Sequence, residues 1–268
     1  MFADNLKDTV SGSYVIASGN VYLEALEGAN TLQEKEEVHQ EYVQKVFELQ
    51  EGATLDSLID IGCTREQAEL ILEFDGTQDI TSIFGFEITC DQNLVSYTYS
   101  NGKTKADIDF SFSRSGVAWH TYRDMILLGW SEGFYCTDTS DMSLTVTYKS
   151  TRNDGTYSVT ATDNRSSNVY KTTIGVGTSG AAFEMDKKIG TRMLVYSGAG
   201  SIHLEKSGRV PEFSFLVSYI ESQKNISNPS LSVGISVSGG NIGGDASISV
   251  SLVDDMEELD HSLEYYEL

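Results

Sequence analysis

Proline and cysteine are scarce in this chain of 268 residues, which has two prolines and three cysteines. With so few cysteines and no CxxC or CxH pattern, the sequence excludes a disulfide-rich scaffold and a cysteine-based zinc finger. Either Cys90 and Cys136 form one bridge in an oxidising compartment, or all three cysteines, including Cys63, are buried thiols. Buried thiols are the favoured interpretation, because free cysteine packs as a small apolar residue.

Long apolar runs are also lacking. No stretch reaches the roughly 18 apolar residues that a membrane-spanning helix needs. The N-terminal residues have neither the basic region nor the apolar region of a signal peptide. We therefore expect no signal peptide and no transmembrane helix. The virion or the cytoplasm is the favoured location.

Basic residues are few: 18 Lys and Arg oppose 40 Asp and Glu, for a net charge of −22. The excess lies at the two ends, because residues 1–86 carry 17 acids and four bases and residues 254–268 carry seven acids and no base. A field of this sign repels nucleic acid and anionic membranes, so we expect no nucleic-acid partner. The charge pattern suggests three parts: an acidic N-terminal unit (1–86), a near-neutral middle (87–253) and an acidic tail (254–268).

Helical signals are concentrated in the first 86 residues. Thr31 and Glu34 form a capping box, and apolar residues then recur at helical spacing, which predicts a helix to about Gln50. A short helix is expected after Thr54. A second capping box, Thr64 to Gln67, predicts another helix that ends near residue 75. The N-terminal unit is therefore expected to be small and mostly helical.

The stretch TLDSLIDIGCTREQAELILEF (54–74) resembles a helix-hairpin-helix unit, and also the first two helices of ubiquitin-associated domains. The shared features are a Leu-containing helix, an Ile-Gly turn and an Ala-containing second helix. Helix-hairpin-helix units often bind DNA through glycine-rich turns and nearby bases. In this chain the turn is Gly62-Cys63-Thr64 and the only base is Arg65, so we interpret the stretch as an αα-hairpin used for packing.

After residue 86 the apolar residues recur at every second position, which indicates β-strands. Asn101-Gly102 between two alternating runs predicts a hairpin, with Val95 opposite Ile108 and Tyr97 opposite Ala106. Further strands are expected at 142–148, 157–161, 169–176, 192–196, 202–204 and 213–219. The segment 116–131 does not alternate and is expected to form one short helix. Turns at intervals of 8 to 12 residues favour an antiparallel β-sandwich or barrel, so the predicted fold class is α+β and mainly β.

The clearest pattern is a long C-terminal β-hairpin at Leu231–Val253. Apolar residues alternate with Ser and Gly on both sides of a glycine-rich turn, which predicts two strands with one apolar face each. Folding the segment about Asn241-Ile242 pairs Leu231 with Leu252, and Val233 with Val250. The same register pairs Ile235 with Ile248 and Val237 with Ala246. The candidate assembly face consists of Leu231, Val233, Ile235, Val237, Ile242, Ile248, Val250 and Leu252.

No catalytic motif stands out. Gly175 to Gly180 reads GxGxxG, but no helix is predicted after it, so a glycine turn explains it better than a dinucleotide site. The four histidines are far apart in the sequence and form no HExxH or HxH pattern. Trp119 and Trp130 are candidates either for a ligand site or for the β core. We expect a protein that is not an enzyme and that has no cofactor or metal.

The expected function is that of a structural subunit of a self-assembling particle or tube, such as a virion protein. Its expected partners are further copies of the same chain in a homo-oligomer, and other assembly proteins are possible partners. The hairpin and the acidic ends would make those contacts, since a strand can extend a neighbour's sheet. The tail, 254–268, is either disordered or a docking segment.

Two alternatives remain open. The hairpin resembles the stem of aerolysin-type toxins in its Ser/Gly face, its apolar face and its apolar tip at Ile242, which implies a pore-forming toxin that acts on membranes. Its alternating arms of about seven residues are short of the roughly 9–11 that a spanning strand needs, and little β-structure can follow. A glycan- or protein-binding β module is the other alternative.

Overall fold

The computed structural model describes residues 11–119, 123–130, 133–136, 141–161, 175–176, 180–186, 188–190, 193–222, 235–238, 247–250 and 256–267. Within these ranges the chain is mainly β. A helical unit near the start is followed by antiparallel sheets, which confirms the predicted fold class.

The helical unit follows the first strand, β1 (Ser11–Asn20). It consists of α1 (Val21–Gly28), α2 (Leu32–Gln50), α3 (Leu55–Asp60) and α4 (Arg65–Glu73), followed by the short 3-10 helix η1 (Thr81–Ile83). Both predicted capping boxes are present, at Thr31 and Thr64, and a third one occurs at Thr54. A capping side chain of this kind contributes about 1 kcal/mol to helix stability, because it satisfies a free N–H at the helix start. The αα-hairpin predicted at 54–74 is therefore present as α3 and α4.

The first and larger sheet, called sheet A here, has the strand order β1-β2-β3-β10-β5-β6, with β9 also paired to β10. Its strands after β1 are β2 (Gly85–Ser100), β3 (Lys103–Ser115), β5 (Met142–Ser150), β6 (Thr156–Ala161), β9 (Lys188–Ile189) and β10 (Met193–Ser207). All pairs along this order are antiparallel. Because β1 pairs with β2, the N-terminal unit contributes a strand to the main sheet.

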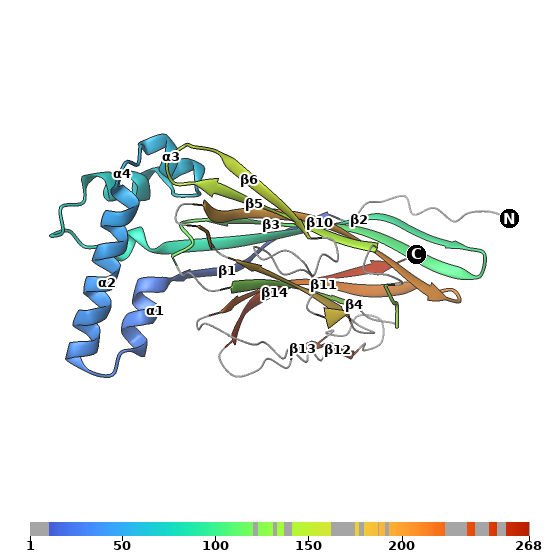
Figure 1. The fold of residues 1–268 in the computed structure, drawn as a ribbon. Coiled ribbons are helices and arrows are strands. Elements are labelled where there is room, and N and C mark those ends of the chain that lie inside the picture. The colour runs from blue at the N-terminus through green and yellow to red at the C-terminus, as the bar shows by residue number, and fades with distance from the viewer. Residues whose placement is uncertain are drawn as a thin grey trace.

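The second sheet, sheet B, has the order β14-β11-β4-β8-β7. Its strands are β4 (Arg123–Trp130), β7 (Gly175–Val176), β8 (Gly180–Asp186), β11 (Glu212–Ser222) and β14 (Met256–Glu267). A separate two-stranded sheet consists of β12 (Ile235–Ser238) and β13 (Ser247–Val250). Figure 1 shows sheet A above sheet B, the β12–β13 pair below sheet B, and the helices gathered at one end of the long strands.

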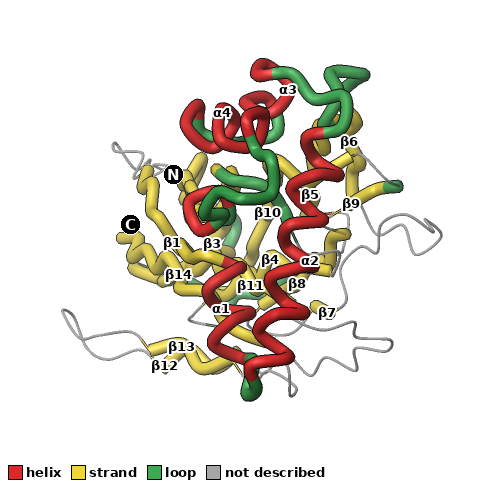
Figure 2. The backbone as a smooth tube through the Cα atoms, turned by 90° about the vertical axis from the view of Figure 1, so that its left-hand side faces the viewer, coloured by secondary structure: helices red, strands yellow, loops and turns green. Residues whose placement is uncertain are grey.

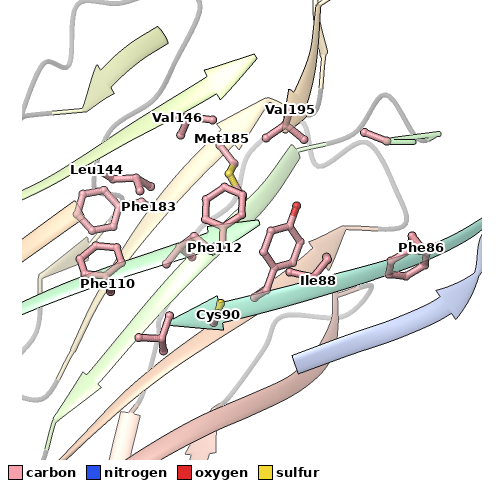
Figure 3. Packing of buried hydrophobic residues seen from close by; sticks show 14 of the residues in the cluster. Phe86, Ile88, Cys90, Phe110, Phe112, Leu144, Val146, Phe183, Met185 and Val195 are labelled. Atoms are coloured by element: carbon pink, nitrogen blue, oxygen red, sulfur yellow. The ribbon is translucent and has the colours of Figure 1, made fainter. Parts of the chain in front are cut away.

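The core fills the space between sheets A and B. Phe110 and Phe112 of β3 point from sheet A toward sheet B, where Phe110 meets Phe183 at a ring distance of 6.2 Å and Phe112 meets Tyr219 at 5.6 Å. Figure 3 shows Phe110, Phe112 and Phe183 together with Met185 of β8. The layers are therefore held together by aromatic side chains that each reach across the sandwich.

The helices are tied to the end of sheet A by buried polar contacts. The backbone N–H of Gly116 donates to the carbonyl of Gly62 at 2.7 Å, which joins the α3–α4 turn to the end of β3. The side chain of Gln67 donates to the carbonyls of Ile83 and Gly85, at 3.1 and 2.9 Å. Figure 2, which looks along the strands from this end, shows the helices covering the end of the sandwich.

The helix predicted at 116–131 is wrong, because residues 123–130 form strand β4. Met125, Ile126, Leu127 and Leu128 are each at most 1% exposed, so both faces of β4 are buried. A strand buried on both faces carries apolar residues at every position, and it then lacks the alternation by which strands are recognised.

The Asn101-Gly102 hairpin is confirmed, but part of its predicted register is wrong. Tyr97 pairs with Ala106 as predicted, whereas Ile108 pairs with Leu94 rather than with Val95. A β-bulge lies between Leu94 and Ser96, and it leaves Val95 half exposed. A bulge places two residues opposite one, so a register counted back from the turn fails beyond it.

The strands expected at 192–196 and 202–204 are parts of one strand, β10, which continues through Gly198 and Gly200. The strand expected at 169–176 lies mostly outside the described residues, and only Gly175–Val176 is seen as β7. The tail was expected to be either disordered or a docking segment. In the structure its strand β14 is an edge strand of sheet B and pairs with β11.

Candidate functional site

The hairpin region is an excursion from sheet B. Strands β11 and β14 are antiparallel neighbours, with Glu212 opposite Glu267 at one end and Ser222 opposite Met256 at the other. The chain therefore leaves the sheet after Ser222 and returns to the same end of the same strand pair at Met256. The ladder between β11 and β14 is formed entirely by residues outside 223–255.

The predicted hairpin is present, with a register that differs from the predicted one by two residues. Ile235 pairs with Val250 and Val237 pairs with Ile248, whereas the sequence suggested Ile248 and Ala246 as their partners. A shift of two leaves every residue on its original face, because side chains alternate with period 2. The apolar pattern fixes the face, but it does not distinguish between registers that differ by two.

Half of the predicted face lies in described residues. Ile235 and Val237 belong to β12, and Ile248 and Val250 belong to β13, so all four occupy one face of the two-stranded sheet. The other four predicted residues, Leu231, Val233, Ile242 and Leu252, lie outside the described residues.

The outer face of sheet B, which points away from sheet A, is buried as well. Met125 and Leu127 of β4, Ala182 of β8 and Leu216 of β11 are each at most 1% exposed, yet they are not part of the core cluster between the sheets. Strand β12 contacts β4, and Figure 1 shows the β12–β13 pair on this side of sheet B. The hairpin therefore lies beside a buried apolar face that belongs to the body of the protein.

Sequence reasoning missed this outer face. The strand predicted at 213–219 carried no assignment of a second buried face; its Phe213, Phe215 and Val217 belong to the core cluster between the sheets. The available signal was the continuous apolar run of β4, which is typical of a strand covered on both sides.

A cluster of charged residues lies on the outer face of sheet A, near the end of β10. Glu205 accepts from Lys103 at 2.7 Å and lies 2.8 Å from the ammonium group of Lys105. These two hydrogen bonds with the lysines lower the pKa of Glu205 to about 2. His203 lies 2.5 Å from Asp107 and 3.6 Å from Glu205, so its ring is placed between two carboxylates.

This cluster does not have the geometry of a catalytic triad. Ser96 donates its hydroxyl hydrogen bond to Asp107, and Asp107 also bonds to His203. In a triad the histidine lies between the serine and the carboxylate, because it has to remove the serine proton. Here the carboxylate takes the middle place, so the imidazole is not positioned to activate Ser96.

Glu205 is expected to make stability depend on pH below the ordinary range of glutamate. Its folded-state pKa of about 2 lies below the ordinary glutamate value of 4.5, so its contribution is complete above pH 4.5 and is lost as the pH falls toward 2. In Glu205→Gln, the free energy of unfolding should be lower than in the wild type at pH 7, and this difference should shrink between pH 4.5 and 2. Urea titrations at several pH values measure it.

The matched control is Glu69→Gln, which removes an exposed pair with Arg65 at 2.9 Å on α4. Exposed pairs of this spacing contribute only about 0.3–0.5 kcal/mol. An equal loss in the two variants, or a Glu205→Gln difference that does not change with pH, would contradict the assignment.

A pocket of about 100 Å³ lies between α2 and the end of sheet A. It is lined by Lys45 and Glu48 of α2, Trp119 after β3, Lys188 of β9 and the apolar residues Leu49, Val117 and Leu194. From the sequence, Trp119 and Trp130 were candidates either for a ligand site or for the β core. Trp130 is instead a core residue whose indole donates to the Phe134 carbonyl at 2.8 Å, whereas Trp119 does line a pocket.

The three cysteines are free thiols, so Cys90 and Cys136 do not form the disulfide that the sequence left open. Burial raises the pKa of Cys63 to about 12, and burial also raises that of Cys90. Cys136 is half-buried.

No three His, Cys, Asp or Glu side chains are grouped to hold a metal ion in the part of the chain that the structure describes. Within the same residues, no helix has the length and apolar character needed to span a membrane.

Comparisons with known proteins give no family. No protein-family model and no curated protein matches the sequence. Among solved structures, the fold is similar to a "Pore forming protein", with 7% identity, a TM-score of 0.34, and coverage of 68% of this chain and 87% of that one.

Two further structures show similarity of the same order. Clostridium perfringens delta-toxin has 10% identity and a TM-score of 0.25, over 67% of this chain and 83% of that one. The collagen binding domain of the Erysipelothrix rhusiopathiae surface protein RspB has 9% identity and a TM-score of 0.28, over 68% and 65%.

Proposed function

We propose that this protein is a pore former, in which several copies assemble side by side and each adds its 231–253 hairpin to a shared transmembrane β-barrel. The observation that carries the proposal is the placement of the hairpin between the paired strands β11 and β14. Within the described residues, the hairpin strands β12 and β13 pair with each other and with no strand of sheets A or B. The hairpin can therefore move away from sheet B while the body of the protein keeps all its strand pairs.

The composition of the hairpin suits a barrel wall. In a membrane barrel each strand alternates between apolar residues that face lipid and small or polar residues that face the lumen. Ile235 and Val237 alternate with Ser236 and Ser238, and β13 repeats the pattern. Asp245 is the only charged residue between Leu231 and Val253, and it lies in the segment that joins β12 to β13.

The length of the hairpin is compatible with spanning a membrane when the flanking residues are included. The described strands β12 and β13 have four residues each. The sequence is uncharged from Asn225 to Gly244 and again from Ala246 to Val253. The first arm can therefore reach the roughly 9–11 residues of a spanning strand without a charge. The second arm has eight uncharged residues, so Asp245 and Asp254 at its two ends would lie at the membrane surfaces.

The proposal keeps one part of the expectation from sequence, which is self-assembly into a homo-oligomer without enzymatic chemistry. A hairpin of two strands cannot close a barrel alone, so pore formation requires several copies. The structural-subunit interpretation differs from the pore proposal in what the hairpin contacts. In a structural subunit the hairpin would pair with a neighbouring protein and would not enter lipid.

Dye release from vesicles tests the proposal. Because a net charge of −22 opposes binding to anionic lipid, the vesicles should be zwitterionic, of phosphatidylcholine with and without phosphatidylethanolamine. We expect release of calcein together with ring-shaped oligomers in negative stain. Oligomers that form without any release would favour the structural-subunit interpretation, and a protein that stays monomeric on vesicles would contradict both.

A further inference from the structure

Sheet A has two stretches of strand edge with which no described strand pairs. The strand β6 is the last one at one side of the sheet, and we call its outer side the β6 edge. At the other side, β1 pairs with β2 only as far as Asn93 and itself contacts β14 of sheet B. Ser96–Ser100 of β2 therefore pairs with β3 alone among the described strands, and we call this stretch the β2 edge. Figure 2 shows β6 and β1 at opposite sides of the sandwich.

Neither edge is protected by charge. The sequences at 94–100 (LVSYTYS) and 156–161 (TYSVTA) contain no charged residue. By contrast, β14 at the edge of sheet B has five acids among its 12 residues. Edge strands commonly carry charges or prolines, because their unpaired N–H and C=O groups otherwise pair with another chain. Two uncharged edges on one sheet therefore favour pairing with a neighbour.

The exposed apolar side chains of the sheets lie on the same two strands. Among the strand residues whose side chains the structure describes, large apolar side chains are exposed only at Val95 (50%), Tyr99 (38%) and Tyr157 (48%). Copies of a chain with a net charge of −22 repel one another, so contacts between them are favoured where both surfaces are neutral and apolar. The two edges provide such surfaces.

The two edges also match each other in the pattern of their faces. On the β2 edge, Tyr97 is buried in the core and Ser96 lies on the outer face of sheet A. On β6, Val159 packs against the core, and the hydroxyl of Thr160 meets that of Thr145 on the outer face at 3.0 Å. When the two edges pair, apolar residues extend the core face and hydroxyl residues extend the outer face. The partner that suits both edges is a second copy of this chain.

We infer that copies of the chain join edge to edge, with the β6 edge of one copy paired to the β2 edge of the next. The inference rests on the proposed function, because it names the contact by which the copies assemble side by side. Four antiparallel pairings separate β2 from β6, so the two strands run in the same direction. Copies related by rotation about a ring axis therefore meet through a parallel ladder. Such head-to-tail contacts between two different surfaces close into a ring when the rotation permits.

The two edges lie at different levels along the strands. Through the ladders of sheet A, Ala161 of β6 is level with Gln92 of β2, whereas the β2 edge begins at Ser96. Neighbouring copies are therefore displaced along the strands, and the strands tilt relative to the ring axis. Strands in closed barrels tilt in the same way.

Tyr99→Asp and Tyr157→Asp test the inference, because each variant charges one edge and leaves the other intact. Oligomer size is measured on phosphatidylcholine vesicles by glutaraldehyde cross-linking and negative stain. We expect each variant alone to stay monomeric, since every contact needs both edges. An equal mixture should form dimers and nothing larger, because only one pair of intact edges remains. Leu32→Asp is the control and should assemble like the wild type, because Leu32 is 86% exposed on α2 and lies on neither edge.

Cysteine cross-linking identifies the pairing directly. In a Cys136→Ser background, copies with Thr98→Cys and copies with Thr160→Cys are mixed on vesicles and treated with a short bismaleimide. Side chains opposite each other on neighbouring strands are about 5 Å apart, and the reagent tolerates a small shift in register. We expect cross-linked dimers in the mixture and none with either variant alone. Thermal melts show whether every variant is folded.

Dye release from the same vesicles separates this inference from the pore proposal. Wild-type rings that need both edges but release no dye would support the inference and contradict the pore proposal. Dye release at the wild-type level by both Tyr99→Asp and Tyr157→Asp would overturn the inference and leave the pore proposal standing. Dimers of either variant alone, cross-linking of Thr160→Cys with itself, or no cross-linking in the mixture also overturns the inference. A wild-type chain that stays monomeric overturns both.

Discussion

Replacing Val237 by Asp is expected to abolish dye release from vesicles while the protein still folds and assembles. Val237 belongs to the apolar face of the β12–β13 pair, opposite Ile248. On this face a charge would meet lipid, and a charged substitution on the lipid face of a barrel costs about 2–4 kcal/mol at the membrane centre for Arg or Lys and less for Asp. Each copy in the oligomer adds the same cost, so insertion of the whole barrel becomes unfavourable.

Ser236→Asp is the matched control, because Ser236 is the adjacent residue on the other face of the same strand. In a barrel this face lines the water-filled lumen, where a charge changes ion selectivity more than stability. We expect dye release by Ser236→Asp within a few-fold of the wild type, together with a stronger preference for cations in planar-bilayer recordings. Thermal melts and negative stain of both variants show whether folding and assembly are retained.

The contrast between the two variants distinguishes the proposed functions. If Val237→Asp prevents assembly in solution in the absence of lipid, the apolar face of the hairpin contacts protein, and the structural-subunit interpretation gains support. If both variants release dye as well as the wild type does, the hairpin does not enter the membrane and the pore proposal is wrong.

Local signals in the sequence were sufficient for the helical unit and for much of the β region. The capping boxes at Thr31 and Thr64 fixed helix starts, because the bonds that they make connect residues only three positions apart. Asn101-Gly102 located the β2–β3 turn for the same reason, and Asn101 does adopt a positive φ of 53°. Such features need no knowledge of the rest of the fold.

What the sequence could not predict depends on contacts between distant segments. The strand nature of 123–130 follows from burial between two layers, and neither layer is visible from the segment itself. The position of β14 beside β11 depends on a pairing across residues 223–255. Nor could the pocket at Trp119 be found, since its lysines, Lys45 and Lys188, are far apart in the sequence and meet only where α2 covers sheet A.

Replacing Gly200 by Ala is expected to destabilise the sandwich strongly. Gly200 of β10 pairs with Phe110 of β3 and with Leu144 of β5. A Cβ atom at this position would lie 2.1 Å from the carbonyl oxygen of Ser143 and 2.5 Å from the ring of Phe110. A backbone oxygen cannot move aside without disturbing the β5–β10 ladder. We expect a loss of about 2–3 kcal/mol in the free energy of unfolding, as in other overpacked cores.

Gly28→Ala is the matched control, because a Cβ atom at this last residue of α1 meets nothing within 4 Å. There the substitution should stabilise by roughly 0.4–1 kcal/mol, since it reduces the freedom of the unfolded chain. Urea denaturation of both variants measures the two opposite effects. Phe110→Leu in the Gly200→Ala background should recover only part of the loss, because the smaller side chain relieves the ring contact and leaves the contact with Ser143 in place. A full recovery would show that Phe110 alone excludes a side chain at position 200, and an unchanged stability in Gly200→Ala would contradict the close packing of β10 against β5.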